Sequence, residues 1–254
     1  MAARHGLDAP DAAVIASGSN VLVHLRPAPV VARVMTGTVV LHGDDPREWL
    51  DREVAVAGYA AERGAPVVAP SDRLPPGPHE HNGLWLTFWR RVEHDPSLPL
   101  DPAEVGRSLR VLHDALAGYD GELPPVAAVR GDIERLIHAG DAPDAHAWQA
   151  ELRRLARIVF DGAGGGGQTL HGDATIGNTL RTPEGLLWND FEDVCRGPVE
   201  WDVGGLVSSF QVRGADDAFI DAVLDGYGGP TREVVEPFVE ASLLYLRAWR
   251  ARRR

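Results

Sequence analysis

Short runs of apolar and β-branched residues, separated by turn residues, dominate the first third of the chain. Four such runs predict strands, at residues 21–25, 30–35, 39–41 and 85–89. Glycines, prolines and the pair Asn82-Gly83 interrupt them. A helical pattern over residues 46–63 stands between the third and fourth runs and ends at Gly64, where glycine suits a left-handed cap. Antiparallel strands with one inserted helix predict an α+β lobe.

The period of the apolar pattern becomes helical from Asp101 onward. Asp101, Pro102 and Glu104 supply an N-cap, a first-turn proline and an acidic third position. Apolar residues follow at helical spacing, at Val105, Leu109, Leu112 and Leu116. A second helix is predicted from near Asp144 to the glycine run at 164–167, and further helices over residues 215–227 and 234–250.

The change of period near Arg90 predicts two lobes. Residues 1–90 should form the N-terminal lobe, and residues 91–254 a mainly helical C-terminal lobe. Within the second lobe, short apolar pieces at 169–170 and 186–188 bracket a polar loop. This loop carries the clearest chemical signal in the sequence.

Composition narrows the classes of function. The chain has 254 residues and a formal charge of −12, which disfavours nucleic acid or an anionic membrane surface as a partner. Neither an apolar run of membrane length nor a basic-then-apolar leader pattern is present, so a cytoplasmic location is expected. Cys195 is the single cysteine, and lysine is absent. Any cation that assists catalysis must therefore be an arginine or a metal ion.

Three polar residues in and after the loop have the chemistry of phosphoryl transfer. Asp173 and Asn178 stand five positions apart in a tight loop, and Asp190 follows the next strand-like piece. A carboxylate that orients a nucleophilic hydroxyl, together with oxygen ligands for magnesium, is the set that this reaction requires. Two alternatives stay open: the side chains could only form turns, or His171 and Asp173 could be ligands in a metal-dependent hydrolase.

The segment from His171 to Asn178, with Asn189-Asp190-Phe191 and the stretch up to Asp202, resembles the aminoglycoside phosphotransferase and choline kinase family. The resemblance implies a bilobal protein-kinase-like fold, with an antiparallel sheet and one helix in a nucleotide-binding N-terminal lobe and a mainly helical C-terminal lobe. By this likeness Asp173 is the catalytic base, and Asn178 and Asp190 hold Mg²⁺. Asp202 would lie at the head of a following helix.

The resemblance extends more weakly into the N-terminal lobe. Gly18, Ser19 and Asn20 resemble a nucleotide loop, in which small residues let backbone N–H groups approach phosphates. Arg33 occupies the strand position where kinases keep a phosphate-binding lysine. Its expected partner is Glu53, with Glu48 as the rival. The backbone of the next strand should receive adenine or guanine, at Thr87, Phe88 and Trp89.

The expected activity is transfer of the γ-phosphoryl group of ATP or GTP to a hydroxyl of a small molecule. An aminoglycoside-like antibiotic or a related amino- or hydroxyl-bearing metabolite is favoured, because nearby carboxylates could bind ammonium groups. These carboxylates are Glu192, Asp193, Glu200 and Asp202, with Asp216 and Asp217 further along. Thr175, Ile176 and Asn189 depart from the family pattern, which indicates a different acceptor pocket. A catalytically silent nucleotide-binding module is the alternative.

Overall fold

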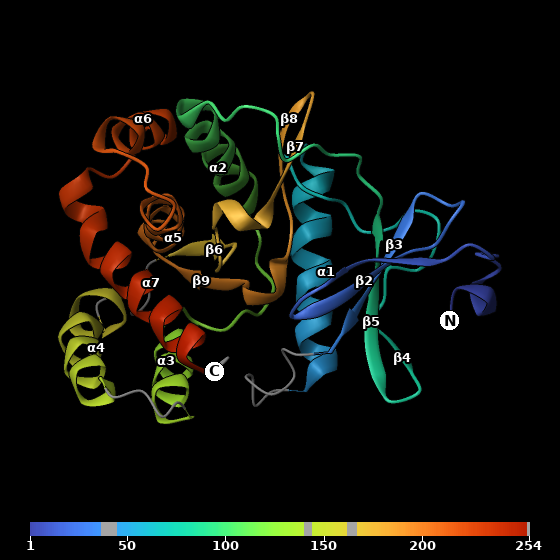
Figure 1. The fold of residues 1–254 in the computed structure, drawn as a ribbon, viewed down its shortest axis with the longest axis horizontal. Coiled ribbons are helices and arrows are strands. Elements are labelled where there is room, and N and C mark those ends of the chain that lie inside the picture. The colour runs from blue at the N-terminus through green and yellow to red at the C-terminus, as the bar shows by residue number, and fades with distance from the viewer. Residues whose placement is uncertain (37–44, 140–143, 162–166, 253–254) are drawn as a thin grey trace. The chain divides into compact units, whose positions relative to one another are not determined.

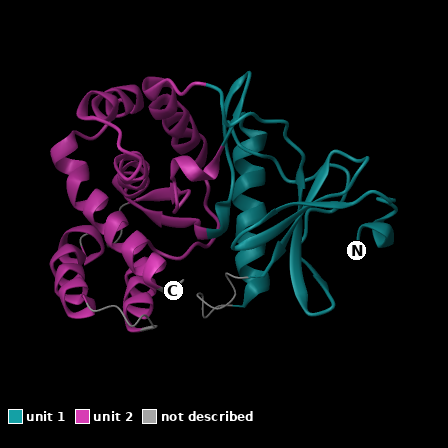
Figure 2. Ribbon diagram, viewed as in Figure 1, with its two compact units in different colours: residues 1–98, 180–192 teal, residues 99–179, 193–254 magenta. Residues whose placement is uncertain are grey.

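The computed structural model describes residues 1–36, 45–139, 144–161 and 167–252, and the chain divides into two compact units (Figure 2). Unit 1 comprises Met1–Leu98 and Leu180–Glu192, and unit 2 comprises Pro99–Thr179 and Asp193–Arg254. The predicted run at 39–41 and most of the glycine run at 164–167 lie outside the described residues.

Unit 1 is built on an antiparallel sheet with one helix (Figure 1). The strands follow the order β1 (Ala13–Ser17), β2 (Asn20–His24), β3 (Val30–Met35), β5 (Leu84–Arg90) and β4 (His79–His81). The helix α1 spans Pro46–Glu62, with the Asp45 side chain as its N-cap. The strands predicted at 21–25, 30–35 and 85–89 and the helix predicted at 46–63 are therefore confirmed. The strand β4 was not predicted, because its sequence His-Glu-His has no apolar residue.

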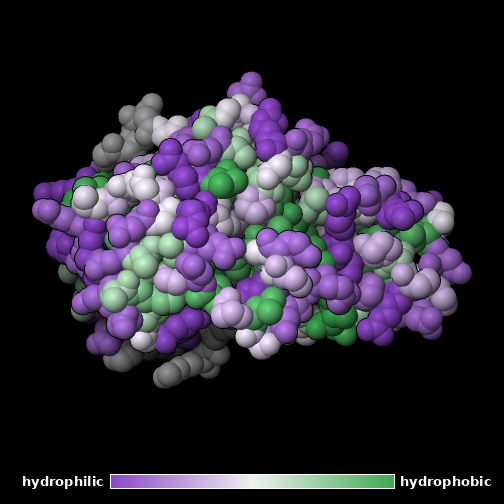
Figure 3. Space-filling model, turned by 90° about the horizontal axis from the view of Figure 1, so that it is seen from above, coloured by the Kyte–Doolittle hydropathy of each residue, from purple (hydrophilic) through white to green (hydrophobic). Residues whose placement is uncertain are grey.

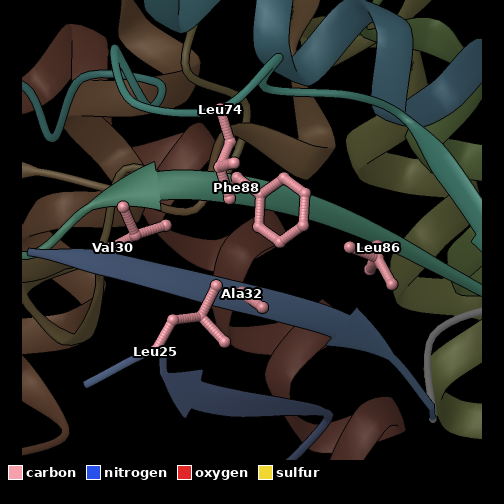
Figure 4. Close-up of a cluster of buried hydrophobic side chains, with 6 residues drawn as sticks. All are labelled: Leu25, Val30, Ala32, Leu74, Leu86 and Phe88. Atoms are coloured by element: carbon pink, nitrogen blue, oxygen red, sulfur yellow. The ribbon is translucent and has the colours of Figure 1, made fainter. Parts of the chain in front are cut away.

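The central strand β3 is buried on both faces, and this directs Arg33 away from the apolar core. Val30 and Ala32 point into a cluster with Phe88 of β5, which Figure 4 shows together with the other members, Leu25, Leu74 and Leu86. Side chains alternate along a strand, so Arg33 points to the opposite face. There it meets Glu53 of α1.

The boundary of unit 1 differs from the one predicted near Arg90. Unit 1 continues to Leu98 and also takes in the hairpin of β7 (Thr179–Thr182) and β8 (Gly185–Trp188) from residue 180 onward. Trp188 is fully buried; its backbone N–H donates to Pro66 O at 2.7 Å, and its carbonyl accepts from Val68 N at 2.8 Å. A pairing between residues more than a hundred positions apart has no local sequence signal.

Unit 2 is mainly helical. Its helices are α2 (Pro102–Leu116), α3 (Ala127–Ala139), α4 (Ala145–Val159), α5 (Glu200–Gln211), α6 (Asp217–Tyr227) and α7 (Arg232–Arg252). The strands β6 (Gln168–Leu170) and β9 (Cys195–Gly197) pair antiparallel. The four helices predicted from periodicity are confirmed, including the Asp101 N-cap, whose side chain accepts from Glu104 N at 3.1 Å. The pattern did not predict α3.

The helix α5 is the centre of unit 2, and α6 and α7 pack beside it (Figure 1). Every residue from Trp201 to Phe210 is buried. A helix that is buried on all sides has no polar face, so it lacks the amphipathic period that identifies a surface helix. Only the family resemblance indicated a helix at this place.

The surface view in Figure 3 is mostly hydrophilic, with hydrophobic residues in small separate patches. Large exposed hydrophobic side chains are scattered over many elements, as Val14, Ile15, Leu84, Val111, Ile158, Val212 and Val234. Among the described residues, none of the helices combines the length and the apolar character that a bilayer crossing demands.

Two glycines let α2 and α6 approach at backbone distance. A Cβ atom on Gly106 would lie 2.0 Å from Val223 O, and one on Gly226 would lie 2.2 Å from Ala103 O. Atoms do not approach this closely without a shift of the backbone. A side chain at either position would therefore push the two helices apart.

We expect Gly106→Ala to lower the free energy of unfolding by about 2–4 kcal/mol, because overpacking outweighs the gain in helix propensity. Urea denaturation of the variant measures this loss. Gly58→Ala in α1 is the matched control, since its nearest neighbour would be Pro70 Cγ at 3.8 Å. The control should gain up to about 1 kcal/mol from helix propensity. Equal stability of Gly106→Ala and the wild type would contradict this packing.

Candidate active site

The catalytic loop begins where β6 ends and needs glycine at its second position. Gly172 follows His171 with φ +88°. A Cβ atom here would lie 1.7 Å from the backbone oxygen of Asp193. Both the positive φ and the close approach exclude other residues. Gly172 therefore lets the chain turn sharply just before Asp173.

A buried carboxylate accepts hydrogen bonds from the backbone of this turn. Asp202, in the first turn of α5, is fully buried and accepts from His171 N at 2.8 Å and from Gly172 N at 2.9 Å. Trp201 Nε1 donates to Gly172 O at 2.7 Å. Both backbone polar groups of Gly172 are thus bonded to neighbouring residues of one helix. The peptide that carries Asp173 has a defined orientation as a result.

Asp173 and Asn178 interact directly within the loop. Asn178 Nδ2 donates to Asp173 Oδ2 at 2.7 Å and to Asp173 O at 2.9 Å. Thr175 N also donates to Asp173 O, at 2.8 Å, and Ile176 N donates to Ser209 Oγ at 3.1 Å. Asp173 is half-buried. The two residues that the sequence predicted to act together are therefore brought together in unit 2.

Unit 1 contains a second cluster of charged residues around Arg33. Its Nη1 donates to both carboxylate oxygens of Glu53 at 2.8 Å, which confirms the predicted pairing over Glu48. Its Nη2 donates to Asp190 Oδ1 at 2.6 Å and also to Glu192. Asn20 Nδ2 donates to Glu192 Oε2 at 3.2 Å. One buried arginine therefore organises three carboxylates.

The charges in this cluster shift one another's ionisation. Burial opposes the charge on Arg33, but the carboxylates of Glu53, Asp190 and Glu192 more than offset it and raise the arginine's pKa. Burial raises the pKa of Glu53 to about 8, although Arg33 acts in the opposite direction. Burial likewise raises the pKa of Glu192. When Glu53 is ionised, three carboxylates face one cation, and this excess of negative charge favours cations.

The predicted magnesium ligands have suitable chemistry. Both Asn178 Nδ2 hydrogen bonds go to Asp173, which turns the amide oxygen of Asn178 elsewhere. Asp190 uses Oδ1 on Arg33 and is about one-third exposed, at 34%. Amide and carboxylate oxygens suit Mg²⁺, which usually takes one or two protein ligands and completes its shell with water and phosphate oxygens. Among the described residues, no group of three His, Cys, Asp or Glu side chains is placed so that it could hold a metal ion.

The predicted nucleotide loop is the turn between β1 and β2. Gly18 N donates to Asn20 O at 3.0 Å, and Ser19 O accepts from Thr36 Oγ1 at 3.2 Å. Among the described residues other than its chain neighbours, none has an atom within 4 Å of where a Gly18 Cβ would be. Asn20 of this turn connects to the Arg33 cluster through Glu192.

The backbone of Phe88, predicted to receive a nucleotide base, has hydrogen-bond partners for both its polar groups. Phe88 N donates to Pro76 O at 2.7 Å, and Phe88 O accepts from Ser71 N at 2.9 Å. The neighbours Thr87 and Trp89 pair with β3, and Trp89 Nε1 donates to Thr87 Oγ1 at 2.8 Å. A non-strand segment covers the side of β5 that was expected to be open. No periodic pattern in the sequence revealed that segment.

Two of the four carboxylates predicted to bind an acceptor are engaged elsewhere. Glu192 contacts Arg33 and Asn20 in unit 1, and Asp202 is enclosed beneath the catalytic loop. Asp193 and Glu200, both half-buried in unit 2, stay candidates for binding an acceptor. His113 is buried and contacts Asp202 through Nε2 at 3.0 Å.

Comparisons with known proteins agree with this chemistry. A model of the phosphotransferase enzyme family matches residues 14–238. No curated protein has a matching sequence. Among solved structures, the amicoumacin kinase hAmiN, in complex with AMP-PNP, Ca²⁺ and its ligand Ami, has a TM-score of 0.75 at 12% identity over 96% of this chain and 81% of its own.

Two further structures are similar over nearly the whole chain. The aminoglycoside phosphotransferase APH(3'')-Id from Streptomyces rimosus, with ADP and streptomycin, has a TM-score of 0.69 at 14% identity over 96% of this chain and 95% of its own. The choline kinase LicA from Streptococcus pneumoniae has a TM-score of 0.69 at 13% identity over 94% of this chain and 83% of its own. These similarities confirm the α+β protein-kinase-like fold.

We expect Arg33→Met to destabilise the chain by about 3–5 kcal/mol near pH 8, because it leaves three carboxylates without their cation. The pKa of Glu53 already lies near 8 against an ordinary 4.5. The folded state therefore binds more protons than the unfolded state in this range, and stability falls as pH rises. Urea unfolding near pH 8 and at about pH 5.5 should show the larger loss at the higher pH.

The control for this experiment is Arg90→Met, which breaks an exposed ion pair with Asp72. It should change stability little at either pH, because exposed pairs contribute little. A loss from Arg33→Met that is independent of pH, or as small as that of the control, would refute the charge balance described for unit 1.

Proposed function

Because this chain belongs to the phosphotransferase enzyme family, we propose that it transfers the γ-phosphoryl group of ATP or GTP to a hydroxyl group of a small molecule. The observation that supports this most directly is the catalytic loop. Asp173 pairs with Asn178 at 2.7 Å on a loop whose backbone is bonded to the buried Asp202. This loop presents a carboxylate in a defined orientation, which is what a general base needs.

Asp173 acts on the acceptor in this proposal. Its carboxylate orients the acceptor hydroxyl and takes up its proton as the oxygen attacks the γ-phosphorus. The new O–P bond forms while the bond from the γ-phosphorus to the bridging oxygen breaks, and the electron pair leaves with the nucleoside diphosphate. Asn178 restrains the rotation of Asp173 through its amide hydrogen bond. Catalysis of this kind depends mostly on positioning.

The oxygen atoms of Asn178 and Asp190 would hold Mg²⁺, which neutralises charge on the transferring phosphoryl group. Arg33 contributes in a second way. Its permanent charge and its two terminal nitrogens align Asp190 and Glu192 while Glu53 holds it from α1. A nucleotide phosphate that binds Arg33 must compete with these carboxylates. The turn at Gly18 and Ser19 would lie against the phosphates, where the lack of a side chain at Gly18 lets the backbone approach.

The acceptor is proposed to be an aminoglycoside-like antibiotic or another small molecule with amino and hydroxyl groups. One similar structure contains streptomycin, and another is that of a choline kinase. Streptomycin and choline are both cations. In this chain, Asp193 and Glu200 of unit 2 are proposed to bind an ammonium group. Asp193 is the last residue of η5 (Phe191–Asp193), and Glu200 is the first residue of α5.

We expect acceptor-dependent consumption of ATP or GTP with Mg²⁺ when the chain is tested against aminoglycosides, other hydroxyl-bearing antibiotics, choline and amino sugars. Asp173→Ala and Asp190→Ala should each lower turnover by at least about a hundredfold with the fold intact, because each removes a group that acts on the reacting atoms. Mass spectrometry of the acceptor identifies the phosphorylated product.

Asp72→Ala, which removes an exposed carboxylate of unit 1, is the matched control and should keep full activity. Near-normal turnover in Asp173→Ala would contradict the proposed base. Nucleotide binding without turnover on any acceptor would instead favour a silent nucleotide-binding module.

A further inference from the structure

Three buried side chains of unit 2 form a hydrogen-bonded chain that ends at the catalytic loop. Tyr227 Oη lies 2.8 Å from His113 Nδ1, and His113 Nε2 lies 3.0 Å from Asp202 Oδ2. The Asp202 carboxylate in turn accepts the backbone N–H groups of His171 and Gly172. Tyr227, the last residue of α6, is thereby connected to the residue that precedes Asp173.

The donor and acceptor roles in this chain follow from its two ends. A carboxylate only accepts, so His113 Nε2 carries the proton that it shares with Asp202. In the neutral imidazole, Nδ1 is then an acceptor and needs a donor, and the Tyr227 hydroxyl is the donor in reach. Burial raises the pKa of Tyr227 above its usual value, so the phenol keeps its proton. Each group along the chain has a partner of the correct kind.

Charged neighbours do not replace the Tyr227 hydroxyl at His113. The guanidinium carbon of Arg110 lies over the tyrosine ring, 5.8 Å from its centroid. Arg110 Nε donates to Asp114 Oδ1 at 2.8 Å on the exposed side of α2. Glu200 and Asp202 also contribute negative charge near Tyr227. The only hydroxyl that the structure assigns to His113 Nδ1 within the described residues is that of Tyr227.

The close contact between α2 and α6 sets the distance between Tyr227 and His113. A Cβ atom on Gly106, two helical turns before His113, would lie 2.6 Å from Tyr227 N. The residue before Tyr227 is Gly226, whose Cβ would meet the backbone of Ala103. The backbone of α6 therefore lies directly on α2 at the place where Tyr227 reaches His113.

We propose that Tyr227 is a positioning residue for phosphoryl transfer, whose hydroxyl fixes the His113 ring in the orientation in which Nε2 donates to Asp202, and so keeps the backbone of the catalytic loop in place. This inference rests on the activity proposed above. Without the hydroxyl, the buried Nδ1 loses its hydrogen-bond donor, and the imidazole ring can turn away from Asp202. The hydrogen bonds of Asp202 to His171 and Gly172 then weaken, because the carboxylate has lost one of its three donors. Tyr227 touches neither substrate in this scheme.

The test compares Tyr227→Phe with Tyr59→Phe, a control that removes a hydroxyl from α1, where the Tyr59 ring contacts Arg63. Three quantities are measured on the full chain. Imidazole ¹⁵N shifts, assigned with His113→Gln, report the tautomer of His113. Amide hydrogen exchange at His171 and Gly172 reports their hydrogen bonds to Asp202. Steady-state kinetics give kcat and the KM for the nucleotide.

In the wild type, we expect a proton on His113 Nε2 and a bare Nδ1. Tyr227→Phe should shift the Nδ1 resonance, which has lost its hydrogen bond, exchange the two amides about tenfold faster and lower kcat about tenfold, as expected for one buried hydrogen bond. The nucleotide KM should stay within about twofold, because the loop and not the nucleotide site is disturbed. Tyr59→Phe should match the wild type in all three measurements.

A wild-type His113 with its proton on Nδ1 would overturn the proposal. So would a Tyr227→Phe variant that keeps the wild-type ¹⁵N shifts and amide exchange, or one that changes both but keeps the wild-type kcat. If the wild type phosphorylates no acceptor, the proposed function fails by itself. The ¹⁵N and exchange measurements then still decide whether Tyr227 holds the loop.

Discussion

The buried carboxylate of Asp202 is the constraint on which the catalytic loop depends. It accepts two consecutive backbone N–H groups, those of His171 and Gly172, and a third contact from His113. A fully buried carboxylate is costly unless it is hydrogen-bonded, and these donors offset that cost. The same bonds orient the peptide before Asp173. Because α5 is buried at the centre of unit 2, the position of Asp202 is fixed, and its hydrogen bonds fix the backbone of the loop.

Because the chain has no lysine, an arginine provides the buried positive charge of unit 1. Arg33 stands in the strand position where kinases keep a lysine, and its planar fork bonds to more groups than an ammonium could align. Glu53 holds one nitrogen, and Asp190 and Glu192 share the other. Arginine therefore serves here as an organiser of acidic residues.

The sequence predicted the features that depend on local pattern. Asp173 and Asn178 could be placed together because a tight loop connects them. The pairing of Arg33 with Glu53 was expected from the family resemblance, and the structure bears out that contact. Features set by tertiary contacts could not be predicted. The role of Glu192, the covered edge at Phe88 and the hairpin that joins unit 1 all depend on residues far apart in the chain. Tyr227 gave no signal, because its partner His113 lies on another helix.

Calorimetric binding of a non-hydrolysable ATP or GTP analogue, with and without Mg²⁺, tests the central claim most directly. The account predicts that Mg²⁺ tightens binding to the wild type and to Asp173→Asn, since Asp173 acts on the acceptor. Asp190→Asn should lose that gain, because it removes a carboxylate ligand of the metal. Binding of neither nucleotide, or a gain from Mg²⁺ that Asp190→Asn retains in full, would contradict the division of roles between Asp173 and Asp190.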